Sequence, residues 1–123
     1  MEKNKTILLV EDHDISARSL VRILEKREYF VFRCENGMEA LDYIREGNKY
    51  DLAIVDSSLS NSIVQGGEIM MESKIKNPSA PVISFSAYNH RPDNGNYIVM
   101  PKSMLIDSAN KEKFLKFLDD LLR

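Results

Sequence analysis

The chain has 123 residues, of which 43% are apolar and 29% are charged, and its formal net charge is −2. This length is enough for one domain with a hydrophobic core, so we expect residues 1–123 to form a single domain. The composition argues against a disordered chain, and the net charge gives no sign of the basic surface typical of nucleic-acid-binding proteins. A single cysteine, Cys34, and the lack of a long apolar N-terminal stretch predict a cytoplasmic protein without disulfides, signal peptide or membrane span.

Five short apolar runs alternate with segments of helical character along the chain. The runs are rich in β-branched and aromatic residues, which is typical of strands buried in a sheet. We expect strands at Ile7–Val10, Tyr29–Phe32, Leu52–Val55, Val82–Phe85 and Tyr97–Val99. We expect helices around Ala17–Leu24, Ala40–Ile44, Glu68–Lys76 and Phe114–Leu121.

Local signals mark the ends of several of these helices. Asp14 is the expected cap of the first helix, and Asn36 with Glu39 resembles a capping box before the second. Gly47 suits the end of the second helix, and Asn77 followed by a proline ends the third. The alternation predicts a doubly wound α/β fold, with a five-stranded parallel sheet covered by helices on both faces.

The segment between Ser86 and Tyr97 breaks this alternation. Its ten residues are polar, include Pro92 and Gly95, and show no helical periodicity. Such a composition favours a loop over a helix. We therefore expect the fourth helix to be shortened or absent.

Acidic residues follow two of the expected strands directly. Glu11 and Asp12 come after the first strand, and Asp56 comes after the third. In open parallel sheets the carboxyl ends of the strands form the ligand-binding edge. Acidic residues after one strand are most often a solvated loop, but the matching position of Asp56 argues for a shared site. Three carboxylates together repel one another unless a cation lies among them, and Mg²⁺ is the expected ion.

The order of these motifs along the chain, each at the end of a strand, resembles that of the receiver domains of two-component response regulators. The resemblance covers essentially the whole chain. It rests on the acidic pair Glu11-Asp12, on Asp56, on Ser86 followed by a small residue, and on Tyr97. Pro101 matches the proline that follows the fifth strand in that family. The resemblance implies the flavodoxin-like strand order 2-1-3-4-5.

The resemblance also implies a function and a role for each site residue. Asp56 would accept a phosphoryl group from a sensor histidine kinase or a phosphotransfer protein. Glu11, Asp12, Asp56 and the backbone carbonyl of Ser58 would hold Mg²⁺. Ser86 would donate a hydrogen bond to the phosphoryl group, and Tyr97 would act as a switch. The domain would be regulatory rather than an enzyme, with a protein target and without direct nucleic-acid or membrane partners.

The chain departs from the family pattern in two further places. Met100 stands where the family has a lysine before the proline, and a thioether cannot supply that positive charge. Lys102 follows two residues later, beyond Pro101, which constrains the local backbone. After Asp56, Ser60 stands where the family usually has a proline, and the polar run 57–62 is expected to be mobile.

Two other classes of function remain to be weighed against phosphoryl acceptance. One is a protein-interaction domain that keeps the receiver fold without being phosphorylated, which Met100 and the short 86–97 connection favour. The other is a flavin- or nucleotide-binding enzyme, which the absence of a glycine-rich loop after the first strand opposes. The chain is either a stand-alone regulator or part of a longer protein, and its kinase and target cannot be named from these residues.

Overall fold

The structure is a computed structural model that describes residues 4–57, 59, 63–86, 97–105 and 107–123. Strands and helices alternate along most of the chain, as the sequence predicted. In order the elements are β1 (Thr6–Val10), α1 (Asp14–Lys26), β2 (Phe30–Cys34), α2 (Gly37–Arg45), β3 (Leu52–Asp56), α3 (Gly66–Lys76), β4 (Val82–Ser86), β5 (Ile98–Pro101), the short 3-10 helix η1 (Lys102–Leu105) and α4 (Ser108–Leu121).

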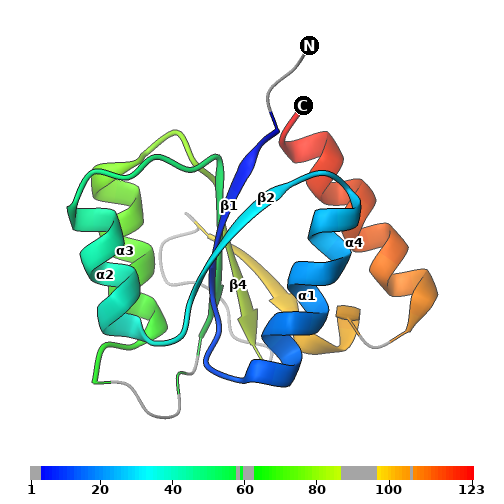
Figure 1. The fold of residues 1–123 in the computed structure, drawn as a ribbon, viewed down its shortest axis with the longest axis horizontal. Coiled ribbons are helices and arrows are strands. Elements are labelled where there is room, and N and C mark those ends of the chain that lie inside the picture. Colours follow the sequence, from blue (N-terminus) through cyan, green and yellow to red (C-terminus); the bar gives the residue numbers. More distant parts are fainter. Residues whose placement is uncertain (1–3, 58, 60–62, 87–96, 106) are drawn as a thin grey trace.

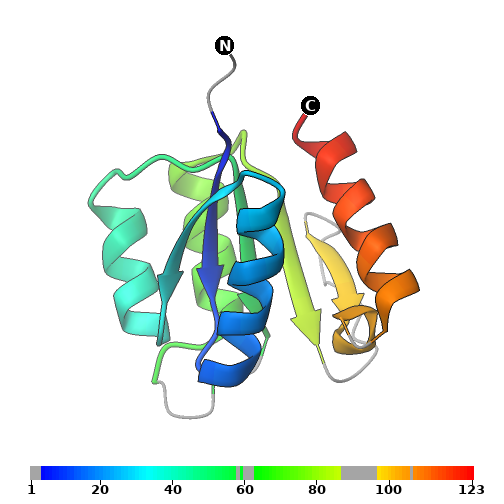
Figure 2. The same cartoon turned by 45° about the vertical axis from the view of Figure 1, so that its right-hand side comes forward.

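The five strands form one parallel sheet in the order β2-β1-β3-β4-β5. Helices α2 and α3 cover one face of this sheet, and α1 and α4 cover the other (Figures 1 and 2). The predicted doubly wound fold and its 2-1-3-4-5 strand order are confirmed. The carboxyl ends of all five strands consequently lie at the same edge, which is where the predicted site belongs.

Two apolar clusters form the core, one on each face of the sheet. Successive residues of β1 enter them alternately, because side chains of a strand point to opposite faces. Leu8 and Val10 belong to the cluster under α2 and α3, whereas Ile7 and Leu9 belong to the cluster under α1 and α4. All four side chains are buried, which explains why this strand reads as a continuous apolar run.

The predicted helix signals are confirmed at α2 and α3 and wrong at α1. The Asn36 side chain caps α2 by accepting the Glu39 amide at 2.8 Å, Gly47 follows this helix with φ +86°, and Asn77 ends α3. The first helix instead begins after His13, whose side chain makes no capping bond. Asp14 is already helical, and its carboxylate accepts a hydrogen bond from the Arg33 guanidinium at 2.8 Å.

The expected strands are each present, with ends that differ by one or two residues. β2 continues to Cys34, two residues beyond the apolar run, because Arg33 can extend its polar head away from the core. β5 begins after Tyr97 and includes Pro101, which an edge strand tolerates. The expected loss of the fourth helix concerns residues 87–96, which lie outside the described residues, so it remains a prediction.

Candidate functional site

Glu11 and Asp56 occupy equivalent positions on neighbouring strands. Val10 pairs with Val55, so the residues that follow them lie side by side at the carboxyl edge of the sheet. Both side chains are largely buried, with 8% of Glu11 and 3% of Asp56 exposed. The sheet register therefore brings together the first and third carboxylates that the sequence singled out, with half-buried Asp12 next to them.

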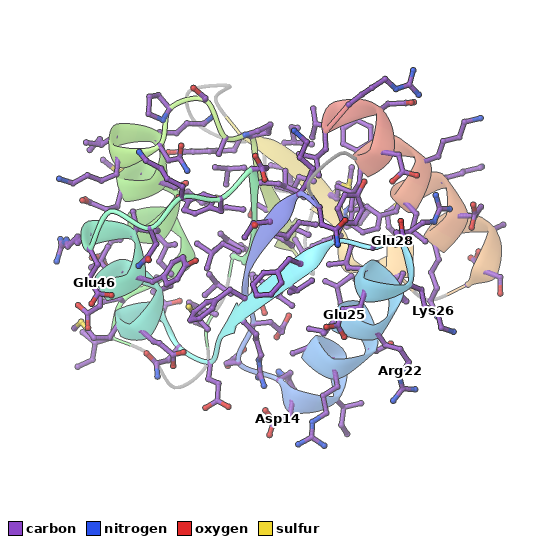
Figure 3. All side chains as sticks on the ribbon, turned by 45° about the horizontal axis from the view of Figure 1, so that its top comes forward. Asp14, Arg22, Glu25, Lys26, Glu28 and Glu46 are labelled. Atoms are coloured by element: carbon purple, nitrogen blue, oxygen red, sulfur yellow. The ribbon has the colours of Figure 1, made fainter. Side chains whose placement is uncertain are left out.

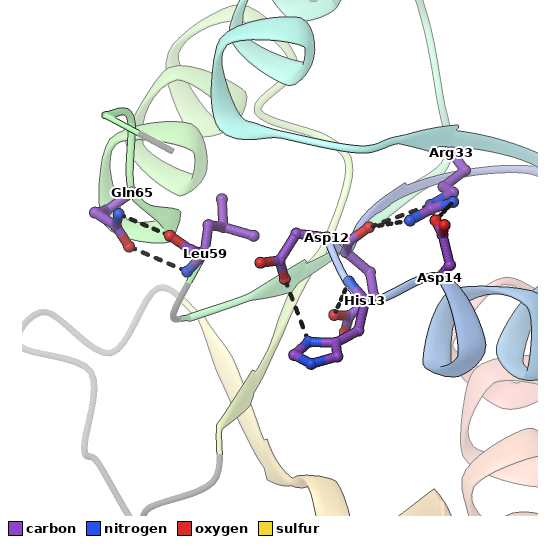
Figure 4. Close-up of polar contacts among 7 residues, drawn as sticks. Asp12, His13, Asp14, Arg33, Leu59 and Gln65 are labelled. Carbon is purple, nitrogen blue, oxygen red and sulfur yellow. Dashed lines mark hydrogen bonds and ion pairs between the residues drawn. The ribbon is translucent and has the colours of Figure 1, made fainter. Parts of the chain in front are cut away.

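A compact group of possible metal ligands lies at the end of β1. Among the described residues, ligand atoms of Glu11, Asp12 and His13 all lie within 4.8 Å of one another. The His13 amide donates to Oε1 of Glu11 at 3.1 Å, and Nδ1 of His13 lies 3.9 Å from Oδ1 of Asp12 (Figure 4). With Asp56 beside them, these carboxylate oxygens fit a hard divalent cation such as Mg²⁺. We did not expect His13 in this group, since a single exposed histidine gives no such signal.

Arg33 on β2 holds the turn between β1 and α1 in place. Its Nη2 and Nε donate to the carbonyl oxygen of Glu11 at 2.9 and 3.2 Å (Figure 4). Its Nη1 donates to Asp14, and Glu35 lies 3.7 Å away. Sequence reasoning missed this residue, although a charged side chain inside an apolar strand was the available signal.

A cavity of about 350 Å³ opens beside the two buried carboxylates. Glu11 and Asp56 line it together with apolar side chains of the sheet and one side of α1. Its remaining lining residues are Leu9, Val10, Ile15, Ser16, Ser19, Leu20, Ile23, Ile54, Phe85 and Leu105. Asp56 is therefore accessible from this cavity although little of its surface is exposed.

The backbone after Asp56 is packed tightly against the beginning of α3. A Cβ atom placed on Gly66 would lie 2.6 Å from the Asp56 carbonyl oxygen and 3.0 Å from the Ser57 Cα, so only glycine permits this approach. The Gln65 amide also makes two hydrogen bonds of 3.1 Å with the backbone of Leu59 (Figure 4). Leu59 is buried and held by these bonds. Residues 58 and 60–62 lie outside the described residues, so the expected mobility of the run 57–62 remains a prediction.

Met100 lies in the same row of the sheet as Asp56. Asp56 pairs with Phe85, and Phe85 pairs with Met100, so Met100 is two strands away at the same height. Its side chain packs on the α1 and α4 face, the same face as Phe85. Met100 therefore shares the row and the face of Asp56, and its side chain is uncharged.

The structure describes only part of the other predicted site residues. Ser86 ends β4 and pairs with Pro101, one row beyond Asp56; its side chain lies outside the described part, as do Ser58 and the Lys102 side chain. Tyr97 packs half-buried against the cluster under α2 and α3. It precedes Pro101 by four residues, roughly 13 Å of extended strand. The structure thus does not bring Tyr97 to Ser86, and the switch role stays a prediction.

Cys34 lies close to the site but does not contribute a nucleophile. Its carbonyl oxygen accepts the Glu11 amide at 3.2 Å, and its side chain is fully buried. Burial, with a smaller effect from the Glu39 charge, raises the pKa of the thiol to about 12. A thiol that stays protonated at neutral pH is inert, so the chemistry of the site belongs to its carboxylates.

A doubly wound parallel sheet with carboxylates at the ends of β1 and β3 defines the class of the protein, a flavodoxin-like fold with an acidic carboxyl edge. The model of the response regulator receiver domain family matches residues 7–105. The chain belongs to this family, whose members are the receiver domains of two-component signalling.

Curated relatives differ widely in length. The chain is 31% identical over 91 residues to the polar-differentiation response regulator DivK of Brucella anthropi, covering 72% of each protein. It is 33% identical over 84 residues to a cyclic di-GMP phosphodiesterase of Thermotoga maritima, covering 68% of this chain but 22% of that protein. The chain likewise spans 20% of the transcriptional regulatory protein ZraR of Klebsiella oxytoca.

Solved structures of receiver domains superimpose closely on the chain. The response regulator protein TrrA of Thermotoga maritima, in complex with Mg²⁺ and BeF, is 29% identical, with a TM-score of 0.69 and coverage of 91% of this chain and 97% of that one. A second match is the complex of histidine kinase ThkA with TrrA, at 26% identity, TM-score 0.75 and coverage of 97% and 99%. Within the described part of this chain, no helix has the length and apolar character needed to span a membrane.

Proposed function

We propose that residues 1–123 form a single receiver domain that accepts a phosphoryl group on Asp56 in the cytoplasm. The donor is a histidine kinase or a phosphotransfer protein. The observation that supports this most directly is the buried Asp56 carboxylate, which lines a cavity beside Glu11 at the carboxyl edge of the sheet. The domain acts as a regulator that holds the group, not as an enzyme that turns over a substrate.

In this proposal the residues at the sheet edge hold Mg²⁺ and position the reacting groups. Asp12 and Asp56 would bind the ion directly, Glu11 would bind it through water, and the Ser58 carbonyl would complete the protein ligands. The ion would neutralise charge on the phosphoryl oxygens, which is most of what phosphoryl transfer requires from a protein. A carboxylate oxygen of Asp56 attacks phosphorus in line, and the donor leaves with the electron pair of the broken bond.

Ser86 and Tyr97 would report the presence of the phosphoryl group. The Ser86 hydroxyl donates a hydrogen bond to a phosphoryl oxygen, and Tyr97 moves inward from its half-buried position. Because residues 87–96 favour turns over helix, we propose that the fourth helix is shortened or absent and that the output surface differs from that of other receivers. Backbone chemical shifts of residues 87–96 would test this, and a regular helix there would contradict it.

The solved relatives support the cofactor and the partner. TrrA was crystallised with Mg²⁺ and BeF, and another structure holds TrrA in complex with the histidine kinase ThkA. Both structures are more than 25% identical to this chain and cover most of it. We therefore propose Mg²⁺ and a histidine kinase for this chain as well.

Intact-mass spectrometry after incubation with acetyl phosphate and Mg²⁺ tests the proposal. We expect the mass of one added phosphoryl group on the wild-type chain and none on Asp56→Asn. Asp42→Asn removes an exposed carboxylate on α2 and should leave the adduct unchanged. An adduct that persists in Asp56→Asn would place the acceptor elsewhere.

The alternative is an interaction domain that functions without phosphorylation. The uncharged Met100 in the row of Asp56 favours it, because phosphoryl oxygens would lack a positively charged side chain from β5. This alternative predicts no adduct with acetyl phosphate and no binding of beryllofluoride in the presence of Mg²⁺. The intact set of Glu11, Asp12 and Asp56 opposes it, since an interaction domain does not require buried carboxylates.

A further inference from the structure

The outer strand β2 presents an unusual aromatic surface. It is the first strand in the sheet order, so within the described part of the chain no strand pairs with its outer side. Phe30 is 62% exposed and Phe32 is 37% exposed. Phe32 stacks on Tyr43 of α2, with ring centroids 4.2 Å apart and planes at 18°. We call Phe30, Phe32 and Tyr43 the β2 aromatic patch.

The backbone of β2 next to this patch is open for pairing. The Phe30 amide donates to Lys5 at 2.9 Å, and the Cys34 carbonyl accepts from Glu11 at 3.2 Å, so the even-numbered residues bond toward β1. By the alternation of a parallel ladder, the N–H and C=O groups of Val31 and Arg33 point away from β1. β2 also lacks proline, lysine and a bulge, the usual features that protect an edge strand.

Charge does not prevent two such edges from meeting. Arg33 is the only charged residue of β2, and its guanidinium is bound by the Glu11 carbonyl and Asp14, with Glu35 at 3.7 Å. Its positive charge is therefore balanced on each copy. Opposed outward residues of antiparallel strands exchange N–H···O=C bonds, so two copies of this strand can bond to each other through Val31.

We propose that a second copy of this chain pairs antiparallel through β2 and joins the two sheets into one continuous sheet. The two-fold axis passes at Val31, so that Phe30 of each copy lies opposite the partner's Phe32. Such non-hydrogen-bonded pairs bring α-carbons to about 4.5 Å, and aromatic pairs across strands are favourable. An axis at Arg33 would instead oppose two arginines, and an axis at Phe32 would place Phe30 opposite Cys34.

Sedimentation velocity over a concentration series, without phosphoryl donor, tests the dimer. We expect wild-type protein to form a closed dimer and Phe30→Lys to raise its dissociation constant at least tenfold. Ile75→Lys is the matched control, because Ile75 is 68% exposed but lies on α3. Circular dichroism verifies that both variants are folded. A monomer at every concentration, open-ended aggregates, or an equal effect of Ile75→Lys would overturn the proposal.

Residue-resolved amide exchange tests the pairing itself. The outward amide of Val31 should exchange more slowly in concentrated than in dilute samples, whereas the Phe30 amide, bonded to Lys5, should be protected at both concentrations. Phe30→Lys should abolish the concentration dependence. A dimer in which the Val31 amide exchanges equally fast at both concentrations would show that another surface joins the copies.

Discussion

At the scale of single residues, we expect the uncharged Met100 to limit how strongly the site holds an anionic ligand. It lies in the row of Asp56 and on the same face as Phe85. Met100→Lys should place a cation next to the acidic site and strengthen beryllofluoride binding on the order of tenfold, because a positioned charge in a water-poor site is strong. Calorimetric titration with beryllofluoride and Mg²⁺ measures this.

Two further variants serve as controls for the effect of Met100→Lys on beryllofluoride binding. Met38→Lys adds the same charge at an exposed position on α2 and should leave beryllofluoride binding unchanged. If Lys102 already supplies the cation, Met100→Lys should have little effect and Lys102→Ala should weaken binding. Insensitivity to both changes would mean that no lysine acts on this ligand.

Glu28 has a strained backbone in the turn between α1 and β2. Its φ of +68° lies in the left-handed region, which costs a residue with a side chain roughly 1–2 kcal/mol. Glu28→Gly should therefore raise the free energy of unfolding by about 1 kcal/mol, measured by denaturant unfolding. Glu25→Gly, one turn earlier within α1, should lower it by a similar amount. Both residues are labelled in Figure 3.

At the scale of elements, the start of α3 supports the loop that follows Asp56. Gly66→Ala would force a Cβ to within 2.6 Å of the Asp56 carbonyl oxygen. We expect a loss of about 1–3 kcal/mol in the free energy of unfolding, typical of overpacking, together with weaker Mg²⁺ binding. Gly67→Ala is the control, since nothing lies within 4 Å of its Cβ position. Equal stability of the two variants would show that the backbone relaxes without cost.

The elements show which parts of the site a sequence can predict. Runs such as Ile7–Val10 predict strands because every side chain is buried, and acidic residues after them predict a site because parallel strands end at one edge. Other contacts join residues that are not neighbours in sequence, such as Gly66 with Asp56 and Arg33 with Glu11. No local sequence pattern predicts such contacts. The expected cap at Asp14 was wrong because the helix begins one residue earlier than expected, with His13 at the N-cap, and the Asp14 carboxylate bonds to Arg33 instead.

At the scale of the whole molecule, a polar cluster ties the end of α1 to α4. Tyr29 donates to Oδ1 of Asp119 at 2.5 Å, and Arg27 pairs with both Asp119 and Glu112. Desolvation by burial, and then the hydrogen bond and charge of Asp119, raise the pKa of Tyr29 well above its usual value. Tyr29→Phe should lower the free energy of unfolding at pH 7 by about 1 kcal/mol, since it removes one such bond.

The same cluster predicts a pH dependence with a definite sign. Because the pKa of Tyr29 is raised on folding, its contribution is complete below the ordinary tyrosine pKa of about 10 and is lost as the pH rises above it. The stability difference between wild type and Tyr29→Phe should therefore shrink as the pH rises beyond 10. Denaturant unfolding at several alkaline pH values measures it. A constant difference would show that ionisation of the Tyr29 hydroxyl does not affect stability in this pH range.

Binding of Mg²⁺ should stabilise the entire domain. Asp56 comes beside Glu11 and Asp12 only when β1 pairs with β3, so an ion bound by all three would favour the folded state and raise the thermal midpoint by mass action. We expect the midpoint to increase with Mg²⁺ concentration and to fall back after addition of a chelator. Asp12→Ala should remove this increase, whereas Asp42→Asn on α2 should retain it. An increase that survives Asp12→Ala would locate the ion away from the carboxyl ends of β1 and β3.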